Sequence, residues 1–281
     1  MIKKAISFAL IALMAAGCTE KIDVKLDSTY TRLVVDGSIE ADSGAYRVAL
    51  TTSADYFSNE PVPRVVNAAV SISDGANTFM LHESQQGFSG IYETDAGFAG
   101  IPGKTYTLHV DLASEITGHA SFEASSYLPQ VTHLDSVGVD FHSEWGPKGI
   151  WTVKLYAQEP GNEVNYYLFN LYKNGVLMTD TITKKVIADD KFYNGSYMNG
   201  VDVIYINNQH DWETLHKGDT IMLQMSGITK EYYDFIDQVK QSGFNLPFFS
   251  GPPANVEGNI NNGGIGFFAA FSNSYAKTVV K

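Results

Sequence analysis

Cys18 is the residue whose type and position most directly indicate chemistry, because it is the only cysteine in the sequence. It follows Gly17, and a small residue before a lone cysteine is typical of the site where a bacterial lipoprotein is cut and acylated. The preceding stretch has both parts of a secretory signal, with Lys3 and Lys4 ahead of a short apolar run. We therefore predict that residues 1–17 are removed and that lipid, palmitate included, is attached to the Cys18 thiol.

The lipid is expected to hold the protein in a membrane without a spanning segment. The apolar run from Ala5 to Ala16 is shorter than the roughly 20 residues that a transmembrane helix needs. Acyl chains anchor a protein to a bilayer, and residues 18–26 would form a tether between the lipid and the folded part. The alternative is an ordinary secreted protein with an incidental cysteine, although lipidation accounts better for a cysteine that has no disulfide partner.

Few patterns in the sequence indicate catalysis. Gly87–Gly90 falls one residue short of the G-x-S-x-G elbow of serine hydrolases, and no cysteine is left as a nucleophile once Cys18 is lipidated. The 31 aspartate and glutamate residues could include a carboxylate pair for glycoside hydrolysis, since such pairs leave no local motif. A non-catalytic protein without a cofactor is favoured, and a hydrolase is the alternative.

Several other residues have the types that bind cofactors or metals but lack the arrangement. Gly264–Ala269 reads G-x-G-x-x-A, yet a strand-like aromatic run follows where a dinucleotide site needs the start of a helix. The seven histidines lack zinc-site spacing, and Asp189–Asp190 is interpreted as a solvated turn. Turn formation and ligand binding both stay open for the asparagines near the C-terminus. These are Asn255, Asn259, Asn261 and Asn262.

The composition limits the partners and the fold class. The formal net charge of −12 repels phosphate backbones, so nucleic-acid binding is not expected. A hydrophobic content of 44% is enough for real cores, which excludes wholesale disorder. Sixteen tyrosines, sixteen phenylalanines and 25 glycines, together with long alternating segments, indicate β-structure.

Period-two alternation predicts an all-β fold with one helix. We expect an N-terminal sandwich of immunoglobulin or prealbumin type over 27–128 and a second β-rich domain over 129–281, with the boundary at Leu128–Pro129. The first domain should contain strands at 32–39, 45–50, 68–73, 78–82, 90–92 and 103–111. The second should contain strands at 150–157, 166–172, 201–206 and 219–225, and a final strand pair at 267–271 and 276–280.

One segment has the signals of a helix over about 229–242. Thr229 is a good N-cap, no glycine or proline interrupts residues 230–240, and Gly243 is placed to end the helix. Tyr232 and Ile236 fall on the same face, which should pack against a sheet.

Pairs of adjacent aromatic residues are candidates for binding, because the two rings of a pair cannot both enter one core from a regular strand. The outward ring would either fill a second packing surface or form a platform for a sugar, a peptide or a partner protein. Phe248 and Phe249 lie in the proline-stiffened loop Asn245–Gly266, which would either plug the core or present a ring to a partner. The candidate contact residues are Tyr167, Tyr233, Phe248 and Phe249.

The C-terminal part resembles a known family. Pro247–Ile260 and Gly263–Ala269 resemble the signature of the domain of unknown function 4249 family. The family's other landmarks are resembled, in the same order, by Leu33–Ile39, Asn67–Ile72, Gly90–Tyr92 and Glu231–Asp234. The resemblance implies a lipoprotein of a Bacteroidetes-type bacterium, often encoded beside a TonB-dependent outer-membrane receptor. It implies no activity, so it supplies no functional residues.

These observations together predict a lipid-anchored protein of the outer membrane, on the cell surface or on the periplasmic face. We expect a non-catalytic accessory or binding component of a TonB-dependent nutrient uptake system, with the membrane as partner through Cys18 and the receptor as candidate protein partner. A surface hydrolase and a structural or adhesive envelope protein are the alternatives.

Overall fold

The structure is a computed structural model that describes residues 31–54, 60–84, 89–161, 163–207, 214–242 and 256–281. Cys18, Phe248 and Phe249 lie outside these residues, so the predictions made for them stay predictions. The described part is mostly β-structure with a single α-helix. The predicted all-β class with one helix is therefore confirmed.

The first seven strands form the part that was predicted as a sandwich. Their alternation is visible in β1, where Leu33, Val35, Gly37 and Ile39 are buried and the residues that alternate with them are not. The strands are β1 (Leu33–Glu40), β2 (Arg47–Thr52), β3 (Ala69–Ser73), β4 (Thr78–Glu83), β5 (Ile91–Glu93), β6 (Thr105–Ile116) and β7 (His119–Tyr127).

The remaining strands include long ones that the sequence pattern located only in part. Two of them, β8 (Leu134–His142) and β9 (Ile150–Gln158), lead into the second half of the chain. The others are β10 (Tyr166–Lys173), β11 (Val176–Leu177), β12 (Val186–Asp189), β13 (Tyr197–Asn207), β14 (Thr220–Ile228) and β15 (Ile265–Val279).

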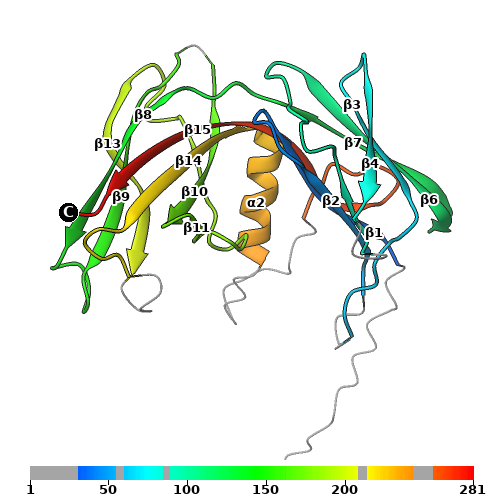
Figure 1. Cartoon of the computed structure of the whole chain (residues 1–281), viewed down its shortest axis with the longest axis horizontal. Coiled ribbons are helices and arrows are strands. Elements are labelled where there is room, and N and C mark those ends of the chain that lie inside the picture. The colour runs from blue at the N-terminus through cyan, green and yellow to red at the C-terminus, as the bar shows by residue number, and fades with distance from the viewer. Residues whose placement is uncertain (1–30, 55–59, 85–88, 162, 208–213, 243–255) are drawn as a thin grey trace, which may run out of the picture.

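One large sheet runs through both halves of the chain. Its strand order is β11-β10-β14-β15-β1-β2-β5-β4-β3-β6-β7, with β12 also paired to β10, while β13, β9 and β8 form a separate three-stranded sheet. Strand β15 joins the halves, since it pairs in parallel with β1 and antiparallel with β14. It forms the top of the arch in Figure 1. The division into 27–128 and 129–281 stays a prediction.

The sequence-based prediction of two final strands is wrong, because β15 is one continuous strand of 15 residues. The polar segment Ser272–Ser274 lies between the two strands predicted at 267–271 and 276–280. In the structure its side chains have partners: Ser272 Oγ donates to the carbonyl of Pro129, and Ser274 Oγ accepts from the amide of Leu134 at 2.7 Å. Bonded to the chain that connects the two halves, these serines can continue the strand without leaving buried polar groups unpaired.

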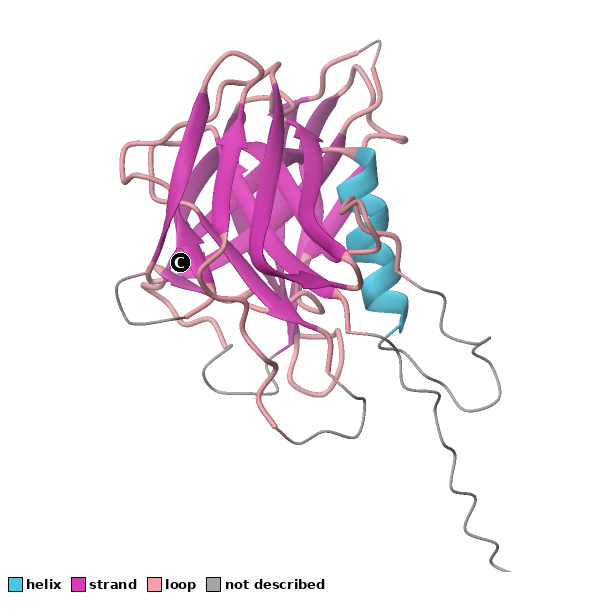
Figure 2. Cartoon of the chain, turned by 90° about the vertical axis from the view of Figure 1, so that its right-hand side faces the viewer, coloured by secondary structure: helices cyan, strands magenta, loops and turns pink. Residues whose placement is uncertain are grey.

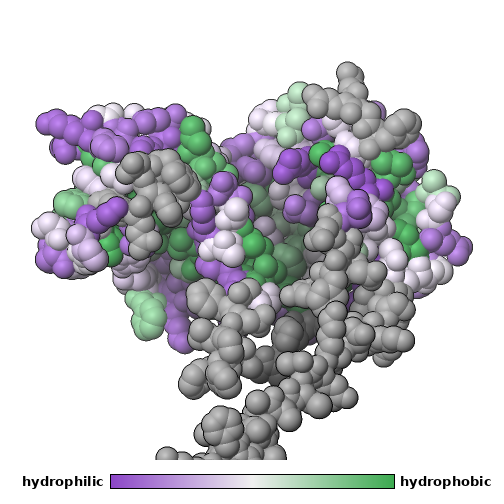
Figure 3. Space-filling view, turned by 90° about the horizontal axis from the view of Figure 1, so that it is seen from below, coloured by the Kyte–Doolittle hydropathy of each residue, from purple (hydrophilic) through white to green (hydrophobic). Residues whose placement is uncertain are grey.

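Two hydrophobic cores lie at the two ends of the arch. The first includes residues from β1 to β7 together with Phe268 and Ala270 of β15. The second lies between β10 and β14 of the large sheet and the three-stranded sheet, and includes Leu155, Leu171 and Leu223. Seen from below, hydrophobic surface gathers between the more polar ends of the molecule (Figure 3).

The predicted helix is confirmed as α2 (Lys230–Ser242). Thr229 caps it, because its Oγ1 accepts from the amide of Tyr232 at 3.2 Å. The ring of Tyr232 packs against Phe267 of β15, with 5.0 Å between ring centroids, and Ile236 is fully buried. The helix thus lies along one side of the strands and closes a third, smaller cluster (Figure 2). No helix in the described ranges has the length and apolar character to cross a bilayer.

Candidate functional site

The three-stranded sheet at the left-hand end of Figure 1 has one face in the core and the opposite face toward solvent. In β9, Val153, Leu155 and Ala157 are buried, so the alternate residues point outward. We call the outward surface the outer face. It comprises Asp140, His142, Trp145, Thr152, Lys154, Tyr156, Tyr197, Asp202 and Tyr205.

Strand pairing sets the outer-face residues in rows across the sheet. Two irregularities in β13 shift its register against β9 and keep Asp202 opposite Lys154 and Tyr205 opposite Thr152. The rows are Tyr205, Thr152 and Asp140; then Asp202, Lys154 and Gly138; then Asn199, Tyr156 and Ser136.

One end of the outer face is aromatic. Trp145, in the turn between β8 and β9, stacks on the imidazole of His142 with 3.9 Å between centroids and 10° between planes. Tyr205 lies next to it, at 6.5 Å from the Trp145 ring. Thr152 beneath is fully buried, and its hydroxyl lies 3.3 Å from His142 Nε2. Trp145 is nevertheless 39% exposed and Tyr205 56% exposed, so both rings present surface to solvent.

The middle of the outer face carries one cation and two carboxylates. Lys154 Nζ forms an ion pair with Asp140, and this hydrogen bond raises the pKa of Lys154. Asp202 adds a smaller electrostatic effect in the same direction. The Asp202 side chain keeps some exposure, but its Oδ1 is enclosed and accepts no hydrogen bond from the described residues. Its charge is therefore only partly compensated.

The far end of the outer face is again aromatic. Tyr156 borders Gly138 and Gly200, whose missing side chains leave room for its ring. Tyr197 is 49% exposed, and its hydrogen bond to the carboxylate of Asp135 raises its pKa. Rings at both ends with charged groups between them make a surface that can stack flat molecules and bond their hydroxyl groups.

A cavity of about 460 Å³ adjoins this sheet. It opens between β10 and β12 on one side and the edge strand β13 on the other. Its wall is mostly apolar, with Thr179, Lys184, Tyr205 and Asn207 as the members that carry polar groups, and the amine of Lys184 pairs with Asp180 at 3.2 Å. The apolar lining residues are Leu171, Met178, Val186, Val203, Ile204 and Ile206.

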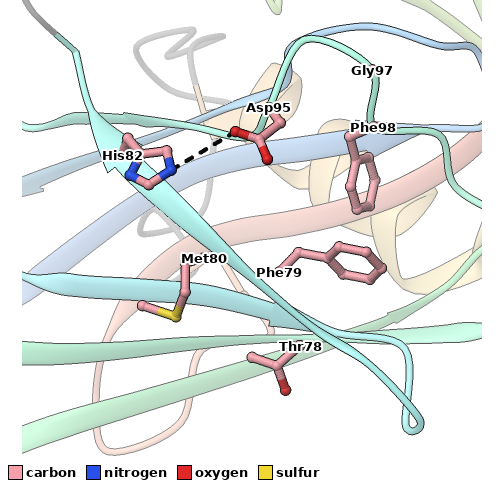
Figure 4. A pocket seen from close by; sticks show the side chains of 7 residues that line it. All are labelled: Thr78, Phe79, Met80, His82, Asp95, Gly97 and Phe98. Carbon is pink, nitrogen blue, oxygen red and sulfur yellow. Dashed lines mark ion pairs between the residues drawn. The ribbon is translucent and has the colours of Figure 1, made fainter.

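A second depression lies at the other end of the molecule, beside β4 (Figure 4). His82 Nε2 and Asp95 Oδ1 lie 3.8 Å apart across it, with side chains 74% and 88% exposed. A pair so open to water is weakly coupled and does not form a proton-transfer pair. Phe79 and Phe98 form its apolar side through an edge-to-face contact.

Titratable groups also gather where β1 meets β15. Asn273 Nδ2 donates to the carboxylates of both Glu40 and Asp42, and Tyr275 Oη donates to Asp42 at 2.6 Å. Burial raises the pKa of Glu40, and the Asn273 hydrogen bond partly opposes that shift. Burial also lowers the pKa of nearby Lys185, against the effect of the carboxylates. A carboxyl group of raised pKa beside a second carboxylate is the arrangement that acid–base catalysis uses.

The structure separates the sequence-predicted contact residues. Tyr167 is 4% exposed, and its ring belongs to the second core. Tyr233 is partly buried and packs on Tyr166, with 5.2 Å between ring centroids. Phe248 and Phe249 lie outside the described residues. Neither Tyr167 nor Tyr233 belongs to the outer face.

The other motifs considered in the sequence analysis lie in strands or directly beside them. Gly264–Ala269 runs into β15 with no helix after it, which removes the geometry of a dinucleotide site. His109 pairs with Glu123 at 2.9 Å across β6 and β7. Asp189 is the last residue of β12 and Asp190 is buried after it. In the described ranges no three or more His, Cys, Asp or Glu side chains are grouped to hold a metal ion.

Sequence reasoning did not find the outer face. Its signal is present in β9, where Thr152, Lys154 and Tyr156 alternate with apolar residues, but alternation alone does not distinguish a functional face from a solvated one. Trp145 lies in the turn between β8 and β9, outside any alternating segment, so its stacking on His142 could not be predicted from the strand pattern.

Comparison with known proteins gives one result. The profile of the Domain of unknown function (DUF4249) family matches residues 19–276, which is nearly the whole chain after the predicted signal. A search of curated proteins finds no match.

Proposed function

The chain belongs to the Domain of unknown function (DUF4249) family, and we propose that it is a lipid-anchored, non-catalytic binding protein of the outer membrane. In this proposal it serves as an accessory component of a TonB-dependent nutrient uptake system. The part that binds the nutrient is the outer face. The part that holds the protein in place is the lipid on Cys18.

The observation that supports binding is the exposure of large rigid rings on a sheet whose other face is core. Trp145 is 39% exposed and Tyr205 56% exposed, and the two rings lie side by side, so they form a shared exposed surface and not two scattered single residues. Aromatic side chains with two rotatable bonds offer contact area at a low cost in conformational entropy, and are therefore enriched at binding surfaces. The strand that carries Tyr205 is anchored by buried Ile204, and the ring of Trp145 is held by its stacking on His142, so neither position depends on a ligand.

Anchoring is supported by the sequence alone. Lys3, Lys4, the apolar run and Gly17 before Cys18 compose a lipoprotein signal. Metabolic labelling with a radioactive or alkyne-bearing palmitate, followed by membrane fractionation, tests this assignment. The native protein should carry label and sediment with the outer membrane, whereas Cys18→Ala should be unlabelled and soluble or unprocessed. A labelled, membrane-bound Cys18→Ala protein would refute the anchor.

The accessory role is tested by co-purification. A tagged native protein, isolated from detergent-solubilised outer membranes under conditions that express its operon, should bring a TonB-dependent receptor with it. Cys18→Ala is the matched control, because it keeps the folded part and removes the anchor. If no receptor accompanies the native protein, the uptake role is wrong.

The alternative function is that of a hydrolase, and the cluster at Glu40 is the observation that favours it. Glu40 has the raised pKa of a general acid, and Asp42 could act as its partner. Incubation of purified protein with envelope and dietary polysaccharides should release reducing sugar if this is correct. Glu40→Gln should then abolish the release, and Glu115→Gln, at an exposed position, should leave it unchanged.

A further inference from the structure

We propose that the outer face is a carbohydrate-binding site whose ligands are uncharged sugars, and this inference rests on the binding role proposed above. The same residues of β8, β9, β13 and the β8–β9 turn carry it.

The first argument is the shape and polarity of the aromatic end. A pyranose ring has an apolar C–H face and a rim of hydroxyl groups, so it stacks on an aromatic ring and bonds polar groups at its edge. The indole ring of Trp145 stacks on the imidazole of His142. Trp145 is still 39% exposed, so part of the indole surface is open to a ligand. Tyr205 lies 6.5 Å away and is more exposed still. The two rings thus form one platform, and the acceptor Asp140 lies in the same cross-strand row as Tyr205.

The second argument is the charge of the middle section. Around Lys154 stand Asp140 and Asp202, and Asp135 lies farther along the same sheet. Three carboxylates against one amine leave the surface negative, in a protein of net charge −12. An anionic ligand is repelled there. Hydroxyl groups, by contrast, are donors that suit carboxylates, and the Asp140 side chain is 53% exposed, so its carboxylate is open to such donors.

The third argument is the extent of the surface. Tyr205 and Tyr197 of β13 lie opposite Thr152 and Gln158 of β9, which are six positions apart and therefore separated by roughly 20 Å at the rise of an extended strand. Tyr156 lies between these ends, opposite Asn199. Rings at intervals along one face of a sheet suit an oligosaccharide chain better than a single sugar.

A peptide is less suitable for the same surface. Peptides that bind to sheets usually add a strand to an edge, where the backbone has unpaired groups. The outer face is centred on β9, whose backbone is paired on both sides, to β13 and to β8. Only side chains are offered there, which is what sugar recognition uses.

The test is titration calorimetry of the detergent-solubilised mature protein, residues 18–281, with soluble oligosaccharides. The neutral panel consists of cello-, xylo-, malto- and manno-hexaose, and oligogalacturonate is the anionic probe. We expect binding of at least one neutral member and at least about tenfold weaker binding of oligogalacturonate.

Two substitutions locate the site, and a third serves as the control. Trp145→Ala and Tyr205→Ala should each weaken binding of the neutral sugar by about tenfold or more, as loss of a stacking anchor does. Tyr127→Ala is the matched control, because Tyr127 is 48% exposed on β7 in the other half of the molecule, and it should bind as the native chain does. Melting curves of all three verify the fold, and Tyr205→Phe, which keeps the ring, should retain binding if Tyr205→Ala unfolds.

Each outcome decides the inference. No binding across the neutral panel, tighter binding of oligogalacturonate, binding of peptides only, or an undiminished affinity of folded Trp145→Ala would overturn it. Receptor co-purification without sugar binding would leave the uptake role in place and remove the carbohydrate assignment alone. Sugar binding without receptor co-purification would support the carbohydrate assignment and remove the uptake role.

Discussion

The side-chain amide of Asn259 pairs with the backbone of Phe268 in both directions. Asn259 Nδ2 donates to the Phe268 carbonyl at 2.8 Å, and Asn259 Oδ1 accepts from the Phe268 amide at 2.9 Å. The same Nδ2 lies 3.0 Å from the carbonyl of Ser125 on β7. The other edge of this part of β15 pairs with β1. Asn259 therefore makes the hydrogen bonds to Phe268 that a neighbouring strand would otherwise make, and it links β15 to β7 through the Ser125 carbonyl.

Asn259→Ala should therefore destabilise the fold by about 2–3 kcal/mol, because it leaves a buried amide and carbonyl of Phe268 without partners. Urea unfolding followed by tryptophan fluorescence measures the loss. Asn207→Ala, at an exposed position, serves as control and should stay within about 0.5 kcal/mol of the native protein. An Asn259→Ala protein as stable as the control would mean that water replaces the amide.

Gly266→Ala should be more damaging. Gly266 has a φ of 96°, and a Cβ there would lie 2.0 Å from the carbonyl oxygen of Val35 on β1. Neither backbone can move without breaking the β1–β15 pairing that joins the two halves, so we expect a loss of about 3 kcal/mol or more, or failure to fold. Expression yield and urea unfolding report it. Gly97→Ala is the control, since a Cβ at Gly97 meets nothing within 4 Å.

Local patterns predicted the local elements and failed where the fold depends on distant pairing. Alternation located β1 and β6, and capping signals located α2, because these elements are determined by residues that are close together in the sequence. The continuity of β15 through Ser272–Ser274 depends on partners near Pro129, more than 130 residues away. No local pattern contains that information.

The asparagines show the same limit. Asn261 Oδ1 accepts from the amide of Glu123 at 2.7 Å, and Asn262 Nδ2 donates to the carbonyl of Ser121 at 2.8 Å. Turn formation and ligand binding were both open for these residues from sequence. In the structure their side-chain amides form hydrogen bonds with the backbone of β7. This role could not be predicted from the sequence, because it depends on which strand lies beside the asparagines.

Tyr167→Phe tests the buried pair at the end of β9. Tyr167 Oη donates to Glu159, at 2.7 and 2.9 Å from the two carboxylate oxygens, and both residues are buried. Removing the hydroxyl leaves that carboxylate with fewer donors and should cost about 1–3 kcal/mol in unfolding free energy. Tyr205→Phe, at an exposed ring, should cost far less. Equal stabilities of the two variants in urea unfolding would contradict the role given to this hydrogen bond.

Glu159 should make stability depend on pH. Burial raises the pKa of Glu159 in the folded protein, and hydrogen bonds from Tyr167 and Asn165 reverse part of the shift. Because the folded state then binds the proton more tightly than the unfolded chain, the protonated group contributes stability below the unfolded pKa. That contribution is lost as the pH rises through the folded pKa.

Glu159→Gln is uncharged at every pH and still offers Tyr167 an oxygen that accepts, so it should not show this loss. The difference in melting temperature between the variant and the native protein should therefore grow in the variant's favour from pH 4.5 toward pH 7. Glu115→Gln, which removes an exposed carboxylate, is the control and should follow the native protein through the same range. A constant difference for Glu159→Gln would mean that its hydrogen bonds fully offset burial, and that the carboxylate enters the folded state at no electrostatic cost.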